Sequence, residues 1–510
     1  MAKRYVINVD LADVWQEKNR KSLLRTLAWG DEVSVVKMGR DYAEIETVEF
    51  VERQDGSILP EKRFGYLQPK KTSGLKLTDV LIPRNRNKVL KVNFVDVQQG
   101  DGSVIESPQG KAMLVDGGDN ELFARYLASR FRGTSPNRPK EIECILVTHG
   151  DADHFVGLPE IQISEQNEAV RKRLFIEPKR VYHNGIVKRP EKKANDKRRN
   201  ETELLGPTRK VGKDLYLVGL VDNLLKVPDK EMNKPFKVWK DTLAKYNKRS
   251  KIEFRRLEIG DDDAFDFFAE EDIKVEVLGP LTSKVGGKSA LKFLGTPPKG
   301  PRIGHESLET DDLKSSGFSA SHTINGHSIV FRLTYGRMSY LFTGDLNDES
   351  SRFLTREHNS GTINLKAEVF KVPHHGSADF SGAFIQAVDP IVSVISSGDE
   401  NARKEYIHPR ATLVGALGKW SRVPEPLVLV TELVAFFNVE GPSRVIDPKK
   451  DKKRGKFFGF SRTAFGMVKT RTDGKRLLVY TDSGNLKMKE AYAYALDKAG
   501  LLEPSEVVRA

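Results

Sequence analysis

The first 75 residues alternate between apolar runs of strand length and polar turns. The runs DEVSVVKM and YAEIETVEFV are separated by turn signals at Gly30–Asp31, Gly39–Arg40 and Asp55–Gly56. Short β-branched runs bounded by Gly and Asp predict strands joined by tight turns. We therefore expect a small β module over residues 1–75, followed by a polar linker over 76–90.

Beyond residue 90 the pattern changes to apolar strands that alternate with helices. LKVNFVDV, AMLVDGG and ECILVTHG are apolar and end in Asp or Gly, and a helical pattern follows DADHFVGLPEI. This order is typical of a sheet covered by helices. HSIVFRLTYG and MSYLFTGD predict a hairpin, and FGMVKTRTDGKRLLVYTDSG predicts a second one with Asp473–Gly474 at its tip. MKEAYAYALDKAG predicts a terminal helix that ends near Gly500.

Residues 161–275 interrupt this pattern. They hold the basic runs RKR at 171–173 and KRPEKKANDKRRN at 188–200. They also hold DLYLVGLVDNLLKV and FKVWKDTLAKYN, which have helical spacing, and end in the acidic stretch DDDAFDFFAEED. We interpret this region as a basic, partly helical insertion that separates the two halves of one domain, residues 91–160 and 276–510.

The net charge, the cysteine content and the length of the apolar runs indicate which partners and which compartment to expect. The net charge of +13 favours a polyanionic partner, although lysine-rich solvated loops would give the same value. The single cysteine, Cys144, excludes an internal disulfide and fits a reducing compartment. No secretory leader is visible, and no apolar run approaches the about 20 residues that span a bilayer. We therefore expect a cytoplasmic protein that makes no membrane contact.

Candidate metal ligands follow three apolar runs. THGDADH places His149, Asp151, Asp153 and His154 within six residues. FTGD ends in Asp345, and VPHHGS carries His374 and His375. A lone His or Asp at a strand end usually caps a turn, but four together favour a site. Imidazole and carboxylate groups suit zinc, manganese or iron.

These motifs resemble a known family when they are taken in order. VDVQQGD (95–101), LVDGG (114–118), THGDADH, FTGD and VPHHGS resemble the metallo-β-lactamase fold, and more closely the hydrolase domain of the DNA-uptake protein ComEC. The resemblance covers about residues 90–160 and 325–420. It implies an αββα sandwich in an α/β or α+β protein. SLLRTLAWGDEVSVV with RFGYLQP resembles a bacterial SH3-like barrel, a module that would bind a protein partner or pack on a neighbouring domain.

The resemblance also implies roles for individual residues. His149 and Asp151 would hold a first metal, Asp153, His154 and His375 a second, and Asp345 would bridge the two. Asp153 would also orient the nucleophile. Asp116 would orient the ligand loop, and His374 would be a neighbour or a further ligand. His408, in YIHPR, corresponds to a late histidine of the family that contacts a phosphate or protonates a leaving group.

Two departures from the family pattern affect the first metal. In ASHTINGHSIVF, His322, Asn325, His327 and Ser328 compete for one position, and Asn325 with Ser328 match the ComEC pattern. With Asp151 in place of a second histidine, the first site is rich in oxygen and leans from zinc toward manganese or magnesium. Occupancy by a single metal is an alternative. Gln98 stands where the family has glycine.

The chemistry that these residues imply is hydrolysis. A divalent metal lowers the pKa of bound water from 15.7 to about 7, which supplies hydroxide at neutral pH. With the basic insertion as a rim, we expect a phosphodiesterase or nuclease that acts on DNA or RNA. The basic runs at 188–200 and 449–456 would either hold phosphate or be flexible, solvated loops. One alternative is hydrolysis of a small molecule, such as a cyclic nucleotide, lactone, thioester or phosphorylated metabolite. Another is a non-catalytic protein that binds nucleic acid or a protein partner.

Overall fold

The chain divides into two compact units. The computed structural model describes residues 3–52, 58–296, 317–398, 408–432, 436–443, 457–464, 466–483 and 488–510. One unit consists of Met1–Lys91 and Leu433–Ala510, and the other of Val92–Glu432. This division differs from the sequence-based one, which gave all of 276–510 to the second half of one domain. The expected linker over 76–90 contains helix α1 (Leu77–Val80) and strand β7 (Leu81–Pro83).

The N-terminal part of the first unit is an antiparallel sheet in the order β3-β2-β6-β5-β4-β1-β7. Its other strands are β1 (Lys3–Ile7), β2 (Leu11–Trp15), β3 (Leu23–Ala28), β4 (Glu32–Met38), β5 (Ala43–Glu52) and β6 (Ile58–Leu67). Ile7, Val14 and Ile45 are fully buried in its core. Because β3 and β7 remain as edges, the closed SH3-like barrel expected over residues 1–75 is not confirmed.

The C-terminal part of this unit is also made of strands. The expected hairpin around Asp473–Gly474 is present as β28 (Met467–Thr472) and β29 (Arg476–Ser483), followed by β30 (Met488–Leu496) and β31 (Leu502–Ser505). β26 (Phe436–Ser443) pairs with β27 (Phe457–Ala464). The predicted terminal helix is wrong, because β30 pairs with β29 along its whole length. Ala, Lys and Glu favour a helix there, but sheet pairing outweighs this preference.

The second unit contains two mixed sheets that face each other. The first sheet has the order β17-β14-β12-β10-β9-β8, and the second has the order β18-β21-β22-β23-β24-β25. The Phe342 ring stacks on Phe331 of its own sheet and on Phe94 of the first sheet, with ring centroids 4.6 and 5.8 Å away. The strands of the first sheet are β8 (Leu90–Val95), β9 (Gly102–Glu106), β10 (Ala112–Asp116), β12 (Cys144–Val147), β14 (Arg180–His183) and β17 (Glu253–Arg256). Those of the second are β18 (Ile273–Gly279), β21 (Val330–Tyr335), β22 (Met338–Phe342), β23 (Val369–Lys371), β24 (Val392–Ile395) and β25 (Leu427–Val430).

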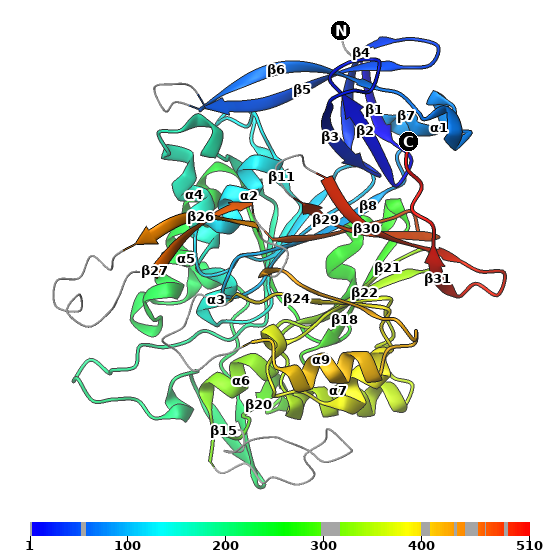
Figure 1. Cartoon of the computed structure of the whole chain (residues 1–510). Coiled ribbons are helices and arrows are strands. Elements are labelled where there is room, and N and C mark those ends of the chain that lie inside the picture. The colour runs from blue at the N-terminus through cyan, green and yellow to red at the C-terminus, as the bar shows by residue number, and fades with distance from the viewer. Residues whose placement is uncertain are drawn as a thin grey trace. The chain divides into compact units, whose positions relative to one another are not determined.

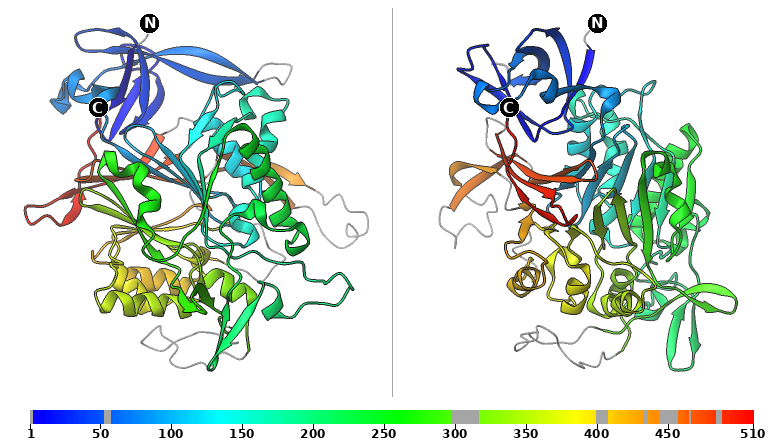
Figure 2. Two further views of the ribbon diagram at one scale, coloured as in Figure 1. Left: turned by 180° about the vertical axis from the view of Figure 1, so that it is seen from behind. Right: turned by 90° about the vertical axis from the view of Figure 1, so that its right-hand side faces the viewer.

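Helices cover the outer faces of both sheets (Figures 1 and 2). Beside the first sheet lie α2 (Leu122–Arg130), α3 (Ala152–Phe155), α4 (Leu158–Ile163) and α5 (Lys234–Arg249). Beside the second lie α6 (Ala320–Gly326), α7 (Asp348–Asn359), α8 (Gly382–Val388) and α9 (Ala411–Lys419). Leu354, Phe384 and Leu413 of α7, α8 and α9 are buried in one core with the second sheet. The unit is therefore an α/β sandwich, as the sequence predicts. Among the described helices, none combines the length and apolarity needed to cross a membrane.

The insertion between the two halves contains less helix than expected. FKVWKDTLAKYN forms α5, whose N-cap Asn233 accepts a hydrogen bond from the Phe236 amide at 3.1 Å. DLYLVGLVDNLLKV is not an α-helix. It begins as β16 (Asp214–Leu217), which pairs with β15 (Thr208–Val211) and β20 (Lys288–Lys292). Small pairs complete the unit: β11 (Lys140–Ile142) with β13 (Ile176–Pro178), and β19 (Ser283–Val285) with β20.

Candidate metal centre

The candidate ligands follow strands of both sheets at the edge where parallel neighbours end. β12 leads into the THGDADH loop, β22 into Asp345, and β23 into His374 and His375. β12 runs parallel to β10 and β14, and β22 runs parallel to β23, so the loops of each sheet lie at one edge. The two facing sheets thereby bring segments about 200 residues apart to one place, as the motif order predicts.

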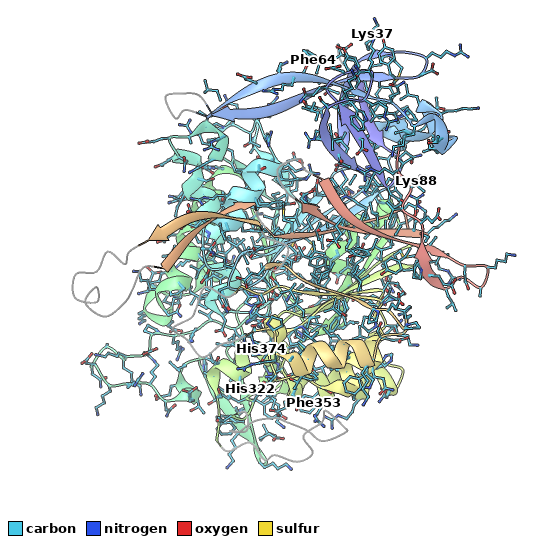
Figure 3. The ribbon with its side chains drawn as sticks, viewed as in Figure 1. Lys37, Phe64, Lys88, His322, Phe353 and His374 are labelled. Atoms are coloured by element: carbon cyan, nitrogen blue, oxygen red, sulfur yellow. The ribbon has the colours of Figure 1, made fainter. Side chains whose placement is uncertain are left out.

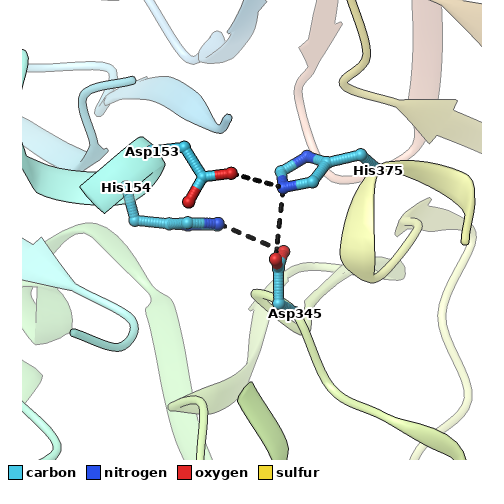
Figure 4. Close-up of side chains that lie close together, drawn as sticks. All are labelled: Asp153, His154, Asp345 and His375. Atoms are coloured by element: carbon cyan, nitrogen blue, oxygen red, sulfur yellow. Dashed lines mark ion pairs between the residues drawn. The ribbon is translucent and has the colours of Figure 1, made fainter. Parts of the chain in front are cut away.

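Four side chains form a compact group (Figure 4). One ligand atom from each of Asp153, His154, Asp345 and His375 lies within 4.8 Å of the corresponding atoms of the others. Asp345 is central. Its Oδ1 lies 3.2 Å from His154 Nε2, and its Oδ2 lies 3.1 Å from His375 Nε2. His375 Nε2 is also 3.4 Å from Asp153 Oδ2.

The chemistry of this group fits a divalent cation. Three imidazole nitrogens and one carboxylate oxygen face inward, and within the described residues they lack hydrogen-bond partners: Nε2 of His149, His154 and His375, and Oδ1 of Asp345. Burying such atoms without a partner is costly unless they coordinate something. Two imidazoles and two carboxylates are also a common donor set for zinc or manganese.

The ionisation of the carboxylates in this group also favours the binding of a cation. Burial by itself would raise the pKa of Asp345, but His375 and His154 hold that pKa well below its usual range. The pKa of Asp153 is likewise lowered by the neighbouring His375 and His154 rings, against the effect of burial. Both carboxylates are therefore ionised at neutral pH. Burial and the charge of His154 lower the pKa of His149 to about 3, so its ring is neutral and has a free lone pair.

Asp116 fixes the ligand loop from behind. It accepts hydrogen bonds from the Thr148 amide at 2.8 Å and from the Thr148 hydroxyl at 2.7 Å. It also contacts His154 Nδ1 at 2.9 Å, which leaves Nε2 pointing to Asp345. Asp116 has the left-handed φ of 57°, an unfavourable backbone conformation that these contacts maintain. The position agrees with the orienting role that the resemblance implies.

Replacing Asp116 by asparagine is expected to weaken metal binding about 10- to 100-fold, because an amide orients His154 less well than a carboxylate does. Equilibrium dialysis against Mn²⁺ or Zn²⁺ measures this change. Asp119→Asn, a matched control in the following loop, should leave the affinity unchanged. Equal affinities of the Asp116 variant and the wild type would show that Asp116 has no orienting role.

The residues assigned to the first metal lie farther apart than the four residues of the compact group. His149 Nε2 lies 3.9 Å from Asp345 Oδ2, and His149 Nδ1 lies 3.3 Å from the Ser328 hydroxyl. Asp151 is outside the compact group, and the Asn325 amide, turned so that its nitrogen faces acceptors, donates to Asp151 Oδ2 at 2.8 Å. Burial and the charge of Asp153 raise the pKa of Asp151 to about 6. Asn325 and Ser328 thus both reach this side of the site.

His322 and His327, the two histidines considered for the same position as Asn325 and Ser328, contact other residues. His322 Nδ1 lies 3.5 Å from an Asp379 oxygen, and His327 Nε2 is 2.7 Å from the Lys292 carbonyl oxygen. His322 and His374 are labelled in Figure 3. Neither His322 nor His327 belongs to the groups of potential ligands found among the described residues.

His327 predicts a pH dependence of stability. Burial lowers its pKa to about 4 from an ordinary value of 6.5. The unfolded chain therefore takes up this proton first as the pH falls. The free energy of unfolding should fall between pH 6.5 and 4 by about 1.4 kcal/mol for each pH unit from this residue. Urea unfolding across this range, compared with His327→Gln, isolates the contribution, and equal slopes for the two proteins would contradict it.

His374 and His408, the last two histidines among the candidate site residues, lie beside each other. His374 and His408 have ring centroids 6.1 Å apart. Burial and the charge of His375 lower the pKa of His408 to about 4, so it is neutral at physiological pH. A neutral imidazole donates a hydrogen bond to a phosphate but is a poor proton donor, which favours the first of the two roles that the resemblance implies.

Sequence reasoning missed a buried ion pair behind His375. Lys371 Nζ lies 2.5 Å from Asp101 Oδ2, and Asp101 Oδ1 lies 3.4 Å from His375 Nδ1. The Ser396 carbonyl oxygen is 3.0 Å from the same nitrogen, so it accepts the Nδ1 proton and leaves Nε2 to face Asp345. A lysine inside the apolar run VFKVP was the available signal, because lysine is rarely buried unless paired.

A second missed contact is that of Gln99, whose amide donates to Asp153 Oδ2 at 3.0 Å. The neighbouring Gln98 has a φ of 64°, so it adopts the left-handed conformation that glycine favours. The loop therefore keeps a glycine-like shape despite the substitution. Gly100 allows close approach here, since a Cβ on it would lie 1.7 Å from the Asp153 carbonyl oxygen.

Comparisons with known proteins cover part of this site, because the family match includes the THGDADH loop and ends before Asp345 and His375. Residues 95–226 match the metallo-beta-lactamase superfamily. ComE operon protein 3 of Bacillus subtilis (strain 168) is 37% identical over 98 residues, which are 19% of this chain and 12% of that protein. Competence protein ComA of Neisseria gonorrhoeae is 40% identical over 86 residues, 17% of this chain and 12% of that protein. The chain thus spans about an eighth of the length of these relatives. Part of the chain, residues 95–226, is therefore similar to the metallo-beta-lactamase superfamily, and shorter stretches are similar to the two competence proteins.

Proposed function

We propose that this chain is a metal-dependent phosphodiesterase that cleaves DNA or RNA. The observation that carries the proposal is the convergence of Asp153, His154, Asp345 and His375, with inward-facing atoms that lack hydrogen-bond partners among the described residues. The superfamily match, the resemblance to DNA-uptake hydrolase domains and the net charge of +13 support it.

Asp153, His154, Asp345 and His375 would hold one divalent cation, and His149 with Asp151 would complete a second site that shares Asp345. The cation would acidify a coordinated water and neutralise charge on the phosphoryl group. We propose manganese or zinc.

Around this position, the protein's own groups hold the candidate ligands in place. Asp116 and Thr148 fix His154, while Ser396 and Asp101 fix His375. Gln99 orients Asp153 through its hydrogen bond. To His408, neutral at physiological pH, we assign a hydrogen bond to a phosphate oxygen of the substrate.

The test is cleavage of labelled single- and double-stranded DNA and RNA by the full chain with Mn²⁺, Zn²⁺ or Mg²⁺. We expect strand cleavage with at least one metal, and loss of cleavage in Asp153→Ala. Bis-p-nitrophenyl phosphate and a lactone are incubated in parallel. Turnover of the diester without strand cleavage would overturn the nucleic-acid assignment, and turnover of the lactone alone would overturn the phosphodiesterase. Cleavage by wild type and Asp153→Ala alike would indicate a contaminant.

A further inference from the structure

A cavity of about 320 Å³ lies beside helix α7 in the second unit. It is bounded by α7, by the turn that follows β18, and by the small sheet with the order β15-β16-β20-β19. Among the described residues, those that line it include no member of the compact group at the candidate metal centre. Its volume is at the lower end of the range for sites that bind small molecules. The cavity is therefore a candidate ligand site distinct from the metal centre.

One wall of the cavity comes from β16 and β20. Tyr216 and Lys292 are cross-strand partners in this antiparallel pair, so their side chains lie on the same face of the small sheet. Asp214, two residues before Tyr216, shares this face, and its carboxylate lies 3.2 Å from the Lys292 ammonium. His327 fixes the end of β20 by donating from Nε2 to the Lys292 carbonyl oxygen at 2.7 Å. The wall thus presents an aromatic ring and an ion pair on a fixed backbone.

A second wall comes from α7. The Arg356 guanidinium lies 4.6 Å from the centroid of the Phe353 ring, and the Lys292 ammonium lies 5.8 Å from the same centroid (Phe353 is labelled in Figure 3). Arg352, one turn earlier on the helix, pairs with Asp348. Within the described part of the chain, the Arg356 guanidinium has neither an ion-pair nor a hydrogen-bond partner. It is therefore available to an anion that enters the cavity.

The rest of the lining is mainly apolar and is buried. Val330, Leu346 and Leu354 contribute aliphatic surface. Because Lys292 and Asp214 pair with each other, the remaining charges of the lining are the Arg356 guanidinium and the Glu357 carboxylate. The cavity thus offers apolar and aromatic surface for a flat ring, a cation for an anionic group, and a carboxylate for a hydroxyl donor.

We propose that this cavity binds a nucleoside monophosphate. The base lies against the Tyr216 and Phe353 rings, because the face of every base stacks on aromatic side chains. The phosphate binds Arg356, whose planar guanidinium matches phosphate oxygens in pairs. The Glu357 carboxylate accepts a hydrogen bond from a sugar hydroxyl. Complete cleavage of nucleic acid releases this class of molecule, so the choice of a nucleotide over another aromatic anion rests on the proposed function.

Isothermal titration calorimetry of the metal-free full chain with adenosine monophosphate tests the proposal, since removal of metal prevents binding of phosphate at the candidate metal centre. We expect saturable binding by the wild type. Arg356→Gln should bind adenosine monophosphate about tenfold more weakly and bind adenosine as the wild type does. Arg352→Gln, the matched control on the same helix, should bind both as the wild type does. Tyr216→Leu keeps apolar volume but removes the ring, and should weaken binding of both molecules about fivefold or more.

Three outcomes of this titration would overturn the assignment. They are the absence of binding by adenosine monophosphate, an equal loss of affinity in Arg356→Gln and Arg352→Gln, and binding of naphthyl phosphate without binding of adenosine monophosphate. The titration uses neither metal nor turnover, so its result is separate from that of the strand-cleavage assay. If the chain binds adenosine monophosphate as described but cleaves no nucleic acid, the proposed function fails and the ligand site stands.

Discussion

Asp345→Ala is expected to abolish metal binding and to lower phosphodiester turnover by about a thousandfold or more. The Asp345 carboxylate is the point at which the His154 and His375 nitrogens meet, at 3.2 and 3.1 Å, and His149 lies 3.9 Å away. Removing it takes the shared ligand from both proposed sites at once, and rate losses of this size are typical when a metal that activates water is lost.

Metal content after dialysis and turnover of bis-p-nitrophenyl phosphate are the measurements. Asp348→Asn is the matched control. It lies three residues further along the chain, at the start of α7, where it pairs with Arg352. It should retain full metal content and activity. If Asp345→Ala kept its metal and its rate, the assignment of the centre would be wrong.

Lys371→Met is expected to destabilise the fold by about 3–5 kcal/mol, the usual cost of removing one partner from a buried ion pair. Burial by itself would raise the pKa of Asp101, and the charge of Lys371 holds that pKa below its ordinary value. Without Lys371, the Asp101 carboxylate remains buried with the more distant His375 ring, at 3.4 Å, in place of its lysine partner. Urea unfolding of the metal-free protein measures the loss.

Two further variants make this prediction specific. Lys366→Met removes an exposed lysine that lies 3.9 Å from Asp389, so it should cost less than about 1 kcal/mol. The double variant Lys371→Met with Asp101→Asn removes both charges and should recover a large part of the stability. A loss below about 1 kcal/mol in Lys371→Met, or no recovery in the double variant, would refute the role of this pair.

The sequence predicted the candidate site better than the elements around it. Asp153, His154, Asp345 and His375 lie in the loops that follow apolar runs, and such runs end at one edge of a sheet, so the sequence predicts that they meet. Asp101 and Lys371 could not be placed, because their ion pair joins residues hundreds of positions apart and leaves no local pattern. Asp101 lies in the VDVQQGD motif, yet its role follows only from its contacts with Lys371 and His375.

Misassigned elements have a common physical cause. The segment that forms β30 is rich in helix-favouring residues, but its pairing with β29 and β31 decides its structure. DLYLVGLVDNLLKV likewise has helical spacing, and its first residues form β16 between two partner strands. Local preference is worth less than about 1 kcal/mol per residue, so tertiary pairing overrides it in both. The basic run at 449–456, for which phosphate binding and a flexible loop were equal expectations, lies outside the described residues.

Anomalous diffraction from crystals grown with Mn²⁺ or Zn²⁺ tests the central claim most directly, because it locates the ion without reference to activity. We predict an anomalous peak within coordination distance of Asp153, His154, Asp345 and His375, about 2.0–2.2 Å from the ligand atoms for zinc. Absence of a peak among these four side chains in metal-loaded crystals, or a peak only at another place, would contradict the account.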